Sequence, residues 1–150
     1  MPRLADQRTR PRPIALGAAL VGAALLVVSP FLMWGQVDIL IGTVSQTGMD
    51  AGSGWVHLVA GLAVAALGGA WVLGAPKRLV QLGWLVLGIV AGAFVLYELS
   101  RVHDCAFFIS EVDECVATPS YGPGLFVALA GALATLAGAG LTLLNRRAAA

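Results

Sequence analysis

The chain alternates between long apolar runs and shorter polar segments. The four apolar runs are Ile14–Trp34, Trp55–Gly74, Leu79–Tyr97 and Pro123–Leu144. None of them contains Asp, Glu, Lys or Arg. Each is about 20 residues long, which at about 1.5 Å of rise per residue matches the hydrocarbon core of a bilayer. Because backbone groups in lipid must pair within their own segment, the pattern predicts four transmembrane helices.

These runs divide the chain into a single predicted membrane domain over residues 1–150. The predicted segments are a first span at 14–34, an outer loop at 35–54, a second span at 55–74, an inner turn at 75–78, a third span at 79–99, an outer loop at 100–122, a fourth span at 123–144 and a tail at 145–150. The short turn makes the second and third spans antiparallel neighbours. Pro30 removes a backbone donor inside the first span, so a kink is expected near its outer end. The predicted fold class is an all-α membrane protein with an antiparallel four-helix transmembrane bundle.

The composition agrees with residence in a membrane. Apolar residues make up 59% of the chain and charged residues 11%, whereas soluble domains carry roughly a quarter charged residues. A water-soluble chain of this size buries too little of its surface to hide so many apolar side chains. The lipid bilayer is therefore the first expected partner. The net charge is +1 and no basic patch is interleaved with aromatic residues, so nucleic acid is not an expected partner.

Charged residues are distributed unevenly between two sets of segments. The N-terminal tail, the turn at 75–78 and the C-terminal tail carry eight of the nine Lys and Arg residues and only one acidic residue. The two long loops and the adjoining helix ends carry one basic and seven acidic residues. The positive-inside rule therefore places both termini in the cytoplasm of a bacterium and the long loops outside its inner membrane. Trp34, Trp55, Tyr97 and Tyr121, near the outer helix ends, are expected to form an interfacial aromatic belt.

The two outer loops are too polar to span a membrane. In the first, Val37, Ile39 and Ile41 alternate with other residues, which weakly indicates a strand. The second holds Cys105 and Cys115, the two cysteines of the chain. Because both lie on the oxidising side of the membrane, they are expected to form a disulfide. The loops are predicted to pack together as a small disulfide-closed extracytoplasmic lobe, in which short β pairing is left open.

Small residues recur at intervals of four within the apolar runs, a spacing that lets helix backbones approach closely. The second span has Gly61, Ala65 and Gly69, and the third has Gly88 and Gly92. These five predicted helix-packing residues favour a compact bundle. They also make self-association, or contact with another membrane protein, an expected property of the chain.

No catalytic, metal or cofactor site is predicted, and the chain is not expected to be an enzyme. His57, Glu98, His103 and Asp104 offer zinc ligands or proton-sensitive groups, but their spacing matches no metal motif. Quinone-linked thiol oxidases of the membrane have a similar layout, but they need a second, closely spaced cysteine pair that this chain lacks. Small multidrug transporters carry an acidic residue in their first helix, and Ile14–Trp34 contains none.

A basic N-terminal tail and three motifs give the chain a recognisable layout. The motifs are SPFLMWGQVDI at the end of the first span, GSGWVHLVAGL at the start of the second and YGPGLFVALAGALATLAG in the fourth. In these features the chain resembles small four-span integral membrane proteins of actinobacterial type. The resemblance covers most of the chain and implies a layout but no activity. The expected function is a non-enzymatic accessory or scaffold subunit of a larger inner-membrane complex, with a small transporter or lipid-handling protein as the alternative.

Overall fold

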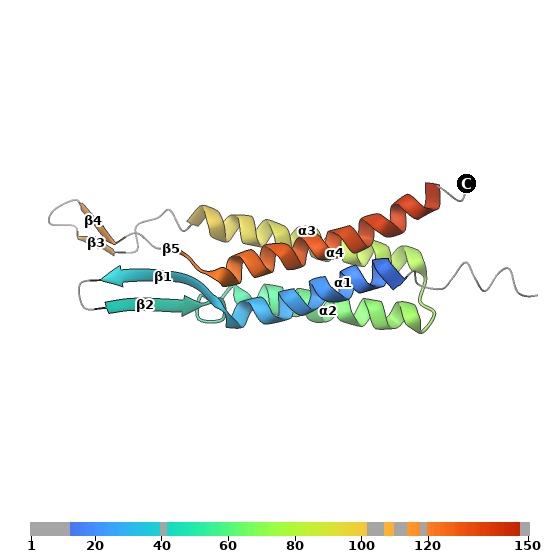
Figure 1. Ribbon diagram of the computed structural model, residues 1–150, viewed down its shortest axis with the longest axis horizontal. Helices are drawn as coiled ribbons and strands as arrows, with labels where there is room; N and C mark the ends of the chain where they lie inside the picture. The colour runs from blue at the N-terminus through green and yellow to red at the C-terminus, as the bar shows by residue number, and fades with distance from the viewer. Residues whose placement is uncertain (1–12, 40–41, 102–106, 110–113, 118–119, 148–150) are drawn as a thin grey trace, which may run out of the picture.

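The structure is a computed structural model that describes residues 13–39, 42–101, 107–109, 114–117 and 120–147 (Figure 1). Its main elements are four helices, each long and apolar enough to cross a membrane. They are α1 (Pro13–Val28), α2 (Gly54–Val72), α3 (Lys77–Arg101) and α4 (Pro123–Arg147). Successive helices run in opposite directions along the long axis of the molecule. The predicted antiparallel four-helix bundle is therefore confirmed as an arrangement of helices.

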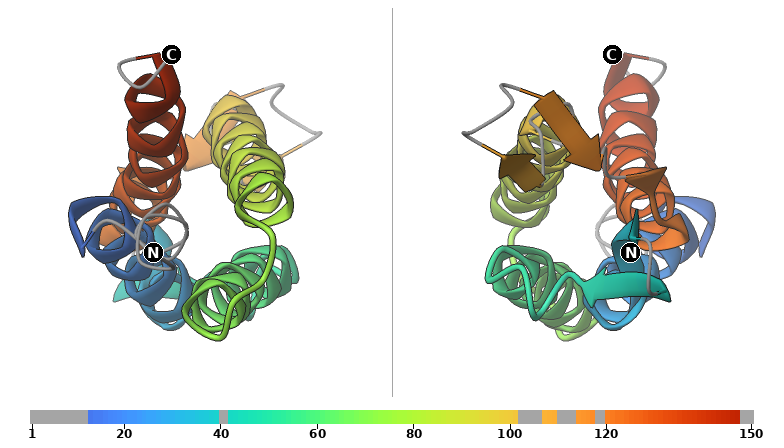
Figure 2. Two further views of the ribbon diagram at one scale, coloured as in Figure 1. Left: turned by 90° about the vertical axis from the view of Figure 1, so that its right-hand side faces the viewer. Right: turned by 90° about the vertical axis from the view of Figure 1, so that its left-hand side faces the viewer.

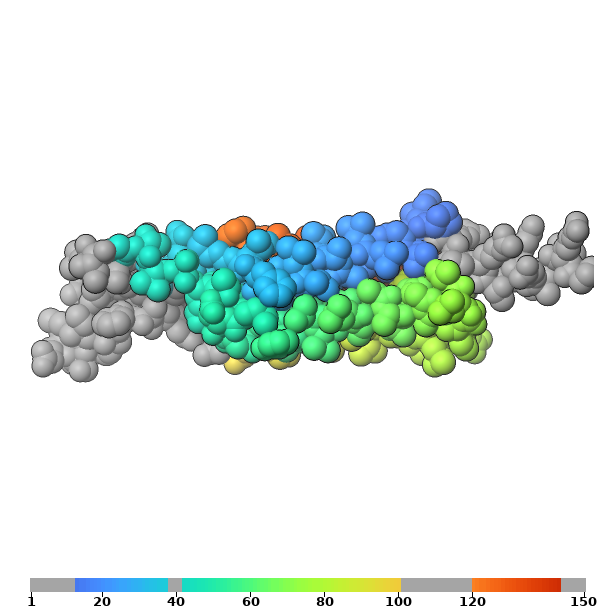
Figure 3. Space-filling model, turned by 90° about the horizontal axis from the view of Figure 1, so that it is seen from below, coloured from blue at the N-terminus to red at the C-terminus, as the bar shows by residue number. Residues whose placement is uncertain are grey.

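The helices form a ring in chain order. Each packs against the next, and α4 closes the ring by packing against α1 in the most extensive helix contact of the molecule. The end-on views show this arrangement (Figure 2). The space-filling view shows α1 and α2 in contact along their length (Figure 3). First and last helices thus share the closest interface although they are farthest apart in the chain.

The interior of the bundle contains many small side chains together with some large ones such as Trp84 and Leu26, and many large apolar side chains face outward. In α1 the buried positions include Ala15, Ala19 and Ala23, whereas Leu20 and Val21 are 42% and 57% exposed. A soluble protein rarely leaves so much contiguous apolar surface in contact with water. Helices that associate in lipid gain nothing by hiding leucine, and they gain dispersion contacts by bringing small residues together. The pattern therefore fits a bundle whose outer surface contacts lipid.

The first helix ends earlier than its hydropathy predicts. α1 stops at Val28, and a 3₁₀ turn, η2 (Ser29–Phe31), leads directly into a strand. Pro30 therefore ends the helix rather than kinking it. Proline has no N–H to bond the carbonyl four residues back, at Leu26. The hydroxyl of Ser29 donates to that carbonyl instead, at 3.1 Å.

The other helix boundaries lie within a few residues of the predicted ones. The connection between α2 and α3 turns at Gly74, whose φ of 101° is in the left-handed region that favours glycine. The backbone N–H of Ala75 then donates to the carbonyl of Ala70 at 2.9 Å, which satisfies one of the last carbonyls of α2. α3 and α4 extend beyond the predicted spans because their charged or polar terminal residues continue the same helices.

The described residues form five strands beyond the helices, at one end of the bundle (Figure 1). β1 (Met33–Ile39) pairs with both β2 (Gly42–Thr47) and β5 (Ser120–Tyr121), giving an antiparallel sheet in the order β2-β1-β5. β3 (Phe107–Ile109) and β4 (Glu114–Ala117) form a separate antiparallel hairpin. Since Gly35 pairs with Tyr121, the predicted packing of the two loops against each other is confirmed. The all-α description is too narrow, because it omits this sheet.

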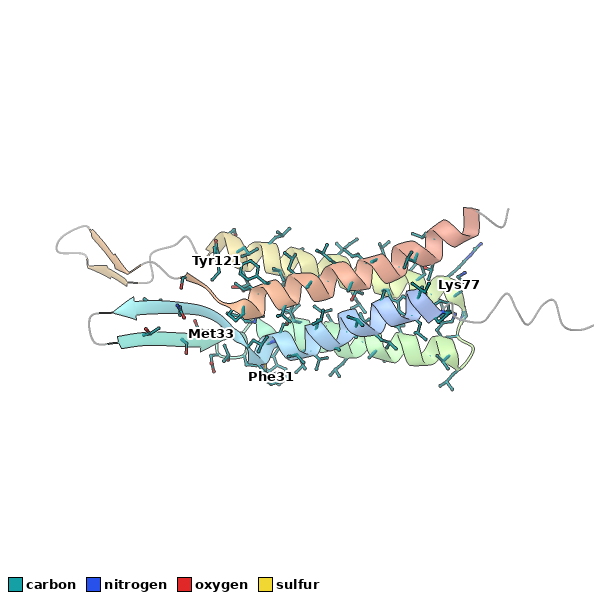
Figure 4. All side chains as sticks on the ribbon, in the orientation of Figure 1. Phe31, Met33, Lys77 and Tyr121 are labelled. Carbon is teal, nitrogen blue, oxygen red and sulfur yellow. The ribbon has the colours of Figure 1, made fainter. Side chains whose placement is uncertain are left out.

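The two ends of the bundle are called here the strand end and the turn end. The strand end carries β1 to β5, and the turn end carries the α2–α3 connection, the start of α1 and the end of α4. Figure 4 places Lys77 at the turn end and Phe31, Met33 and Tyr121 at the strand end. The two groups of segments that the charge pattern distinguishes therefore lie at opposite ends of the bundle. Lys77 and Arg78 lie at the end opposite the sheet.

Candidate functional site

Trp34 joins the sheet to the helices at the strand end. It belongs to β1, yet its side chain is only 4% exposed. Its indole Nε1 donates to the carbonyl of Ser29 at 2.7 Å, and its own carbonyl accepts the N–H of Gly122 at 2.8 Å. The predicted role of Trp34 in an exposed aromatic belt is therefore wrong, because the ring lies inside the protein. Trp55 is 57% exposed and suits that belt.

Two glycines leave the space that the Trp34 ring occupies. A Cβ built on Gly48, in the turn after β2, would lie 2.7 Å from the ring atom Cζ2. A Cβ built on Gly124, in the first turn of α4, would lie 2.8 Å from Nε1. Real Cβ atoms essentially never come so close. The space between Gly48 and Gly124, called here the slot, therefore requires glycine on both sides. The Trp34 ring in this slot fixes β1 against the start of α4.

His57 completes the surroundings of Trp34 from α2. The two rings meet edge to face, with centroids 5.1 Å apart and an interplanar angle of 82°. His57 is fully buried, and neither ring nitrogen has a hydrogen-bond partner among the described residues. The backbones of Ala91 and Ser53 and the carboxyl group of Glu98 are near enough to the imidazole to influence it electrostatically. Buried polar groups are normally paired, so this imidazole is an unusual feature of the strand end.

The zinc or proton-sensitive cluster considered from the sequence is only partly described. His57 and Glu98 lie on neighbouring helices at the strand end, whereas His103 and Asp104 lie outside the described residues. Within the described ranges, no group of three or more His, Cys, Asp or Glu side chains is arranged to hold a metal ion. The described part of the cluster thus offers one imidazole and one carboxyl group.

The predicted disulfide lies outside what the structure describes. Cys105 falls between described segments, and of Cys115 only the backbone is described, within β4. Phe108 faces Cys115 across the β3–β4 hairpin. The Cys105–Cys115 disulfide therefore stays a prediction.

The five predicted helix-packing residues occupy different surroundings. Gly61 faces α1, where a Cβ would lie 2.8 Å from a backbone carbonyl oxygen. Gly88 faces α4, where a Cβ would lie 2.8 Å from a leucine side chain, and Gly92 faces the same helix more loosely, at 3.8 Å. Ala65 is half-buried against the core. Gly69 is exposed, and a Cβ built there has no atom of another described helix within 4 Å.

The closest contact between helix backbones joins α1 and α4. A Cβ on Gly22 of α1 would lie 2.7 Å from the carbonyl oxygen of Gly131, and one on Gly131 of α4 would lie 3.0 Å from the carbonyl oxygen of Gly22. Gly138 approaches α1 as closely, at 2.9 Å from the carbonyl oxygen of Ala15. Gly131 and Gly138 are seven residues apart, about two helical turns. Spacing four marks Gly22, with Ala18, and Gly138, with Ala134. It does not mark Gly131, because the residues four positions away are Val127 and Thr135.

A turn between β2 and α2 is held by Thr47 and Asp50. The hydroxyl and the backbone N–H of Thr47 both donate to Oδ2 of Asp50, at 2.6 and 3.1 Å. The N–H of Asp50 donates back to the Thr47 hydroxyl at 3.3 Å. These hydrogen bonds, that from the hydroxyl first, lower the pKa of Asp50 below its ordinary value. The turn places Gly48 beside Trp34, so the carboxylate supports the slot from outside.

Replacing Thr47 with Val is expected to raise the pKa of Asp50 toward its ordinary value, because the largest stabilising hydrogen bond to the carboxylate is lost. A lowered folded-state pKa means that Asp50 contributes stability at neutral pH. That contribution is lost as the pH falls through the folded pKa. Titration of the Asp50 carboxyl carbon by NMR, in both proteins in the same detergent, measures the change. An identical pKa in the two proteins would show that the turn does not form in solution.

Comparison of the chain with models of known protein families gave no match, and comparison with curated proteins gave none either.

Proposed function

We propose that this chain is a multi-pass protein of the bacterial inner membrane, with both termini and the turn end in the cytoplasm. Four helices of sufficient length and apolar character support a membrane location. Lys77 and Arg78 lie at the turn end, and basic residues are retained on the cytoplasmic side. The strand end then lies outside, where Cys105 and Cys115 meet an oxidising environment and close the second loop with a disulfide.

Within that membrane we propose a non-enzymatic accessory or scaffold role, in which the strand end binds a larger membrane protein. The observation that carries the proposal is the position of β2 at the edge of its sheet. The sheet order places β2 at an edge, and none of the described strands pairs with its outer side. Its residues 42–46 are exposed, including Val44 at 58%. An edge strand of this kind is a template for a strand of another chain.

The composition of β2 supports the same role. Natural proteins protect solvent-exposed edge strands with charged residues, prolines or bulges. The β2 sequence, GTVSQT, contains no charged residue and no proline. The only register shift of the β1–β2 pair lies between Met33 and Gly35, near the helices rather than at the exposed end. This edge therefore lacks the features that prevent pairing.

The edge is also held in a defined position. β2 pairs with β1 over most of its length, and β1 is anchored through Trp34 between α2 and α4. Binding by a preordered strand costs less conformational entropy than binding by a flexible loop. A partner strand added to β2 would thus be fixed relative to the bundle.

A photo-crosslinking amino acid at Ser45, on β2, is expected to capture one membrane protein reproducibly in living cells. The same amino acid at Ala51, an exposed residue of the following turn, is the matched control and is expected to capture little. Capture from both positions alike, or repeated purification of the chain alone as a monomer in mild detergent, would contradict the proposed role.

Val44→Lys is expected to abolish that capture while leaving the stability of the protein almost unchanged. A lysine on an edge strand blocks strand addition, and a substitution at so exposed a position changes the free energy of unfolding by only about 0.5 kcal/mol. The measurements are crosslinking yield from Ser45 and thermal unfolding of the purified protein. Undiminished capture in the lysine variant would show that the partner does not bind through the edge.

The alternative role, in a small transporter or lipid-handling protein, requires a polar path through the bundle. In its middle, α1 and α4 are in direct contact at Gly22 and Gly131. The buried hydroxyl of Thr135 is already used, since it donates to the carbonyl of Gly131 at 2.9 Å. This packing favours the accessory role over transport.

A further inference from the structure

A groove opens between α3 and α4 at the turn end. α4 crosses α3 at an angle, so that its last turns lie away from the start of α3 (Figures 1 and 2). The groove has a volume of about 270 Å³ and is lined by Arg78, Gln81, Leu82, Leu85 and Leu143. It belongs to neither the strand end nor the β2 edge. A second site, with different chemistry, therefore lies at the opposite end of the molecule.

Gln81 is the unusual residue of this groove. It is 5% exposed, and its side-chain amide nitrogen has no hydrogen-bond partner in the described structure. Buried amide groups are nearly always paired, because an unpaired donor loses its hydration without replacement. Gln81 lies one helical turn beyond Lys77, which is roughly 6 Å along the helix axis. In a bundle that spans a bilayer, this depth corresponds to the headgroup and glycerol regions of a leaflet.

The rest of the groove combines a cation with an apolar wall. Arg78 supplies a guanidinium group, whose planar set of donors suits phosphate oxygens. Leu82 and Leu143 are 58% and 46% exposed, and Leu85 lies half-buried between the helices. A ligand that satisfies all of these groups has an anionic, hydrogen-bond-accepting end next to a hydrocarbon chain.

We propose that the groove binds one anionic phospholipid of the surrounding leaflet. Its phosphate accepts hydrogen bonds from Arg78 and from the Gln81 amide, and one acyl chain lies along Leu82, Leu85 and Leu143. The inference goes beyond the accessory role and requires only that the bundle lies in a bilayer. Free phosphate shares the headgroup chemistry, but it leaves the leucine wall without a partner.

Native mass spectrometry of the purified full chain in detergent tests the proposal. Phosphatidylglycerol is expected to bind about tenfold more tightly than phosphatidylcholine of the same acyl chains. Both lipids carry the phosphate, but the choline cation of the second lipid would lie close to the guanidinium group of Arg78 and be repelled by it. Glycerol 3-phosphate, which has the anionic group without the chains, is expected not to compete. Equal binding of the two lipids, or full competition by glycerol 3-phosphate, would overturn the proposal.

Three variants assign the binding to this groove. Arg78→Gln and Gln81→Glu are each expected to weaken phosphatidylglycerol binding about tenfold, the first by removing the cation and the second by placing a carboxylate against the phosphate. Lys77→Gln removes the same charge one residue away from the groove and is expected to leave the preference intact. If Gln81→Glu does not fold, comparing the phosphatidylglycerol binding of Arg78→Gln with that of Lys77→Gln still tests whether the groove is the binding site. Equal losses in these two variants would mean general attraction to a basic surface, and would refute a defined site.

Discussion

Trp34→Ala is expected to release the β1–β2 hairpin from the helices, at a cost of about 3–5 kcal/mol for truncating a buried aromatic residue. The indole fills the slot between Gly48 and Gly124 and packs against His57. Alanine would leave that slot empty and the Ser29 carbonyl without its donor. Backbone amide exchange of residues 33–47 should therefore rise strongly in detergent-solubilised protein. The helices should retain their protection, since they make their own ring of contacts.

Two further tryptophan variants serve as controls. The first separates the packing of Trp34 from its hydrogen bond, and the second tests an exposed tryptophan. Trp34→Phe keeps an aromatic ring but loses the bond to Ser29, so an intermediate loss of about 1 kcal/mol is expected. Trp55→Ala removes an equally large but exposed side chain and should leave exchange of the hairpin unchanged. Protection of β1 and β2 that survives Trp34→Ala would show that the sheet is held by other contacts.

Gly22→Val is expected to destabilise the whole bundle, because α1 and α4 touch at this position. Even a single Cβ at Gly22 would collide with the hydroxyl oxygen of Thr135 and lie 2.7 Å from the backbone nitrogen of the same residue. Backbone atoms of a packed helix cannot give way locally, so the two helices must separate. Overpacking of this kind typically costs 1–3 kcal/mol, and about 3 kcal/mol is expected here. Thermal unfolding followed by circular dichroism in one detergent measures the loss.

Gly17→Val provides the matched control on the same helix. A Cβ on Gly17 meets nothing within 4 Å, so the valine points away from the other helices. Its unfolding temperature should stay close to that of the unmodified protein. If both valine variants unfold at the same temperature, the close approach of α1 and α4 at Gly22 does not exist in the folded protein.

Hydropathy predicts the number, order and approximate bounds of the helices because the free energy of transfer sums over many residues in each run. It fails at the end of α1 for a physical reason. Phe31 to Trp34 are apolar, and hydropathy records only that such residues avoid water. It does not distinguish lipid from the interior of a protein, which is where Trp34 is found. The residue that indicates the end of α1 is Pro30, because proline cannot donate the backbone hydrogen bond that would continue the helix.

The features of the candidate sites depend on contacts that local sequence patterns do not contain. The pairing of Gly35 with Tyr121 joins two loops separated by two helices, α2 and α3. Small residues occur on every face of these helices, so spacing alone does not say that Gly61 meets another helix and that Gly69 does not. Gln81 is a single polar residue in an apolar run, and only the divergence of α4 from α3 makes its amide an unpaired donor beside a groove.

The helix ring and the β2-β1-β5 sheet are both completed by elements late in the chain, and this order affects biosynthesis. α1 packs against α4, and β1 pairs with β5. The ribosome must therefore synthesise nearly the whole polypeptide before the helix ring or the sheet is complete. Until then the backbone of β1 has an open side at the site that Ser120 and Tyr121 later occupy. Inserted chains that stop short of this final stretch therefore expose both an incomplete sheet and the face of α1 that carries Ala15, Ala19 and Gly22. Those are two surfaces by which quality-control factors of the membrane would recognise an unfinished product.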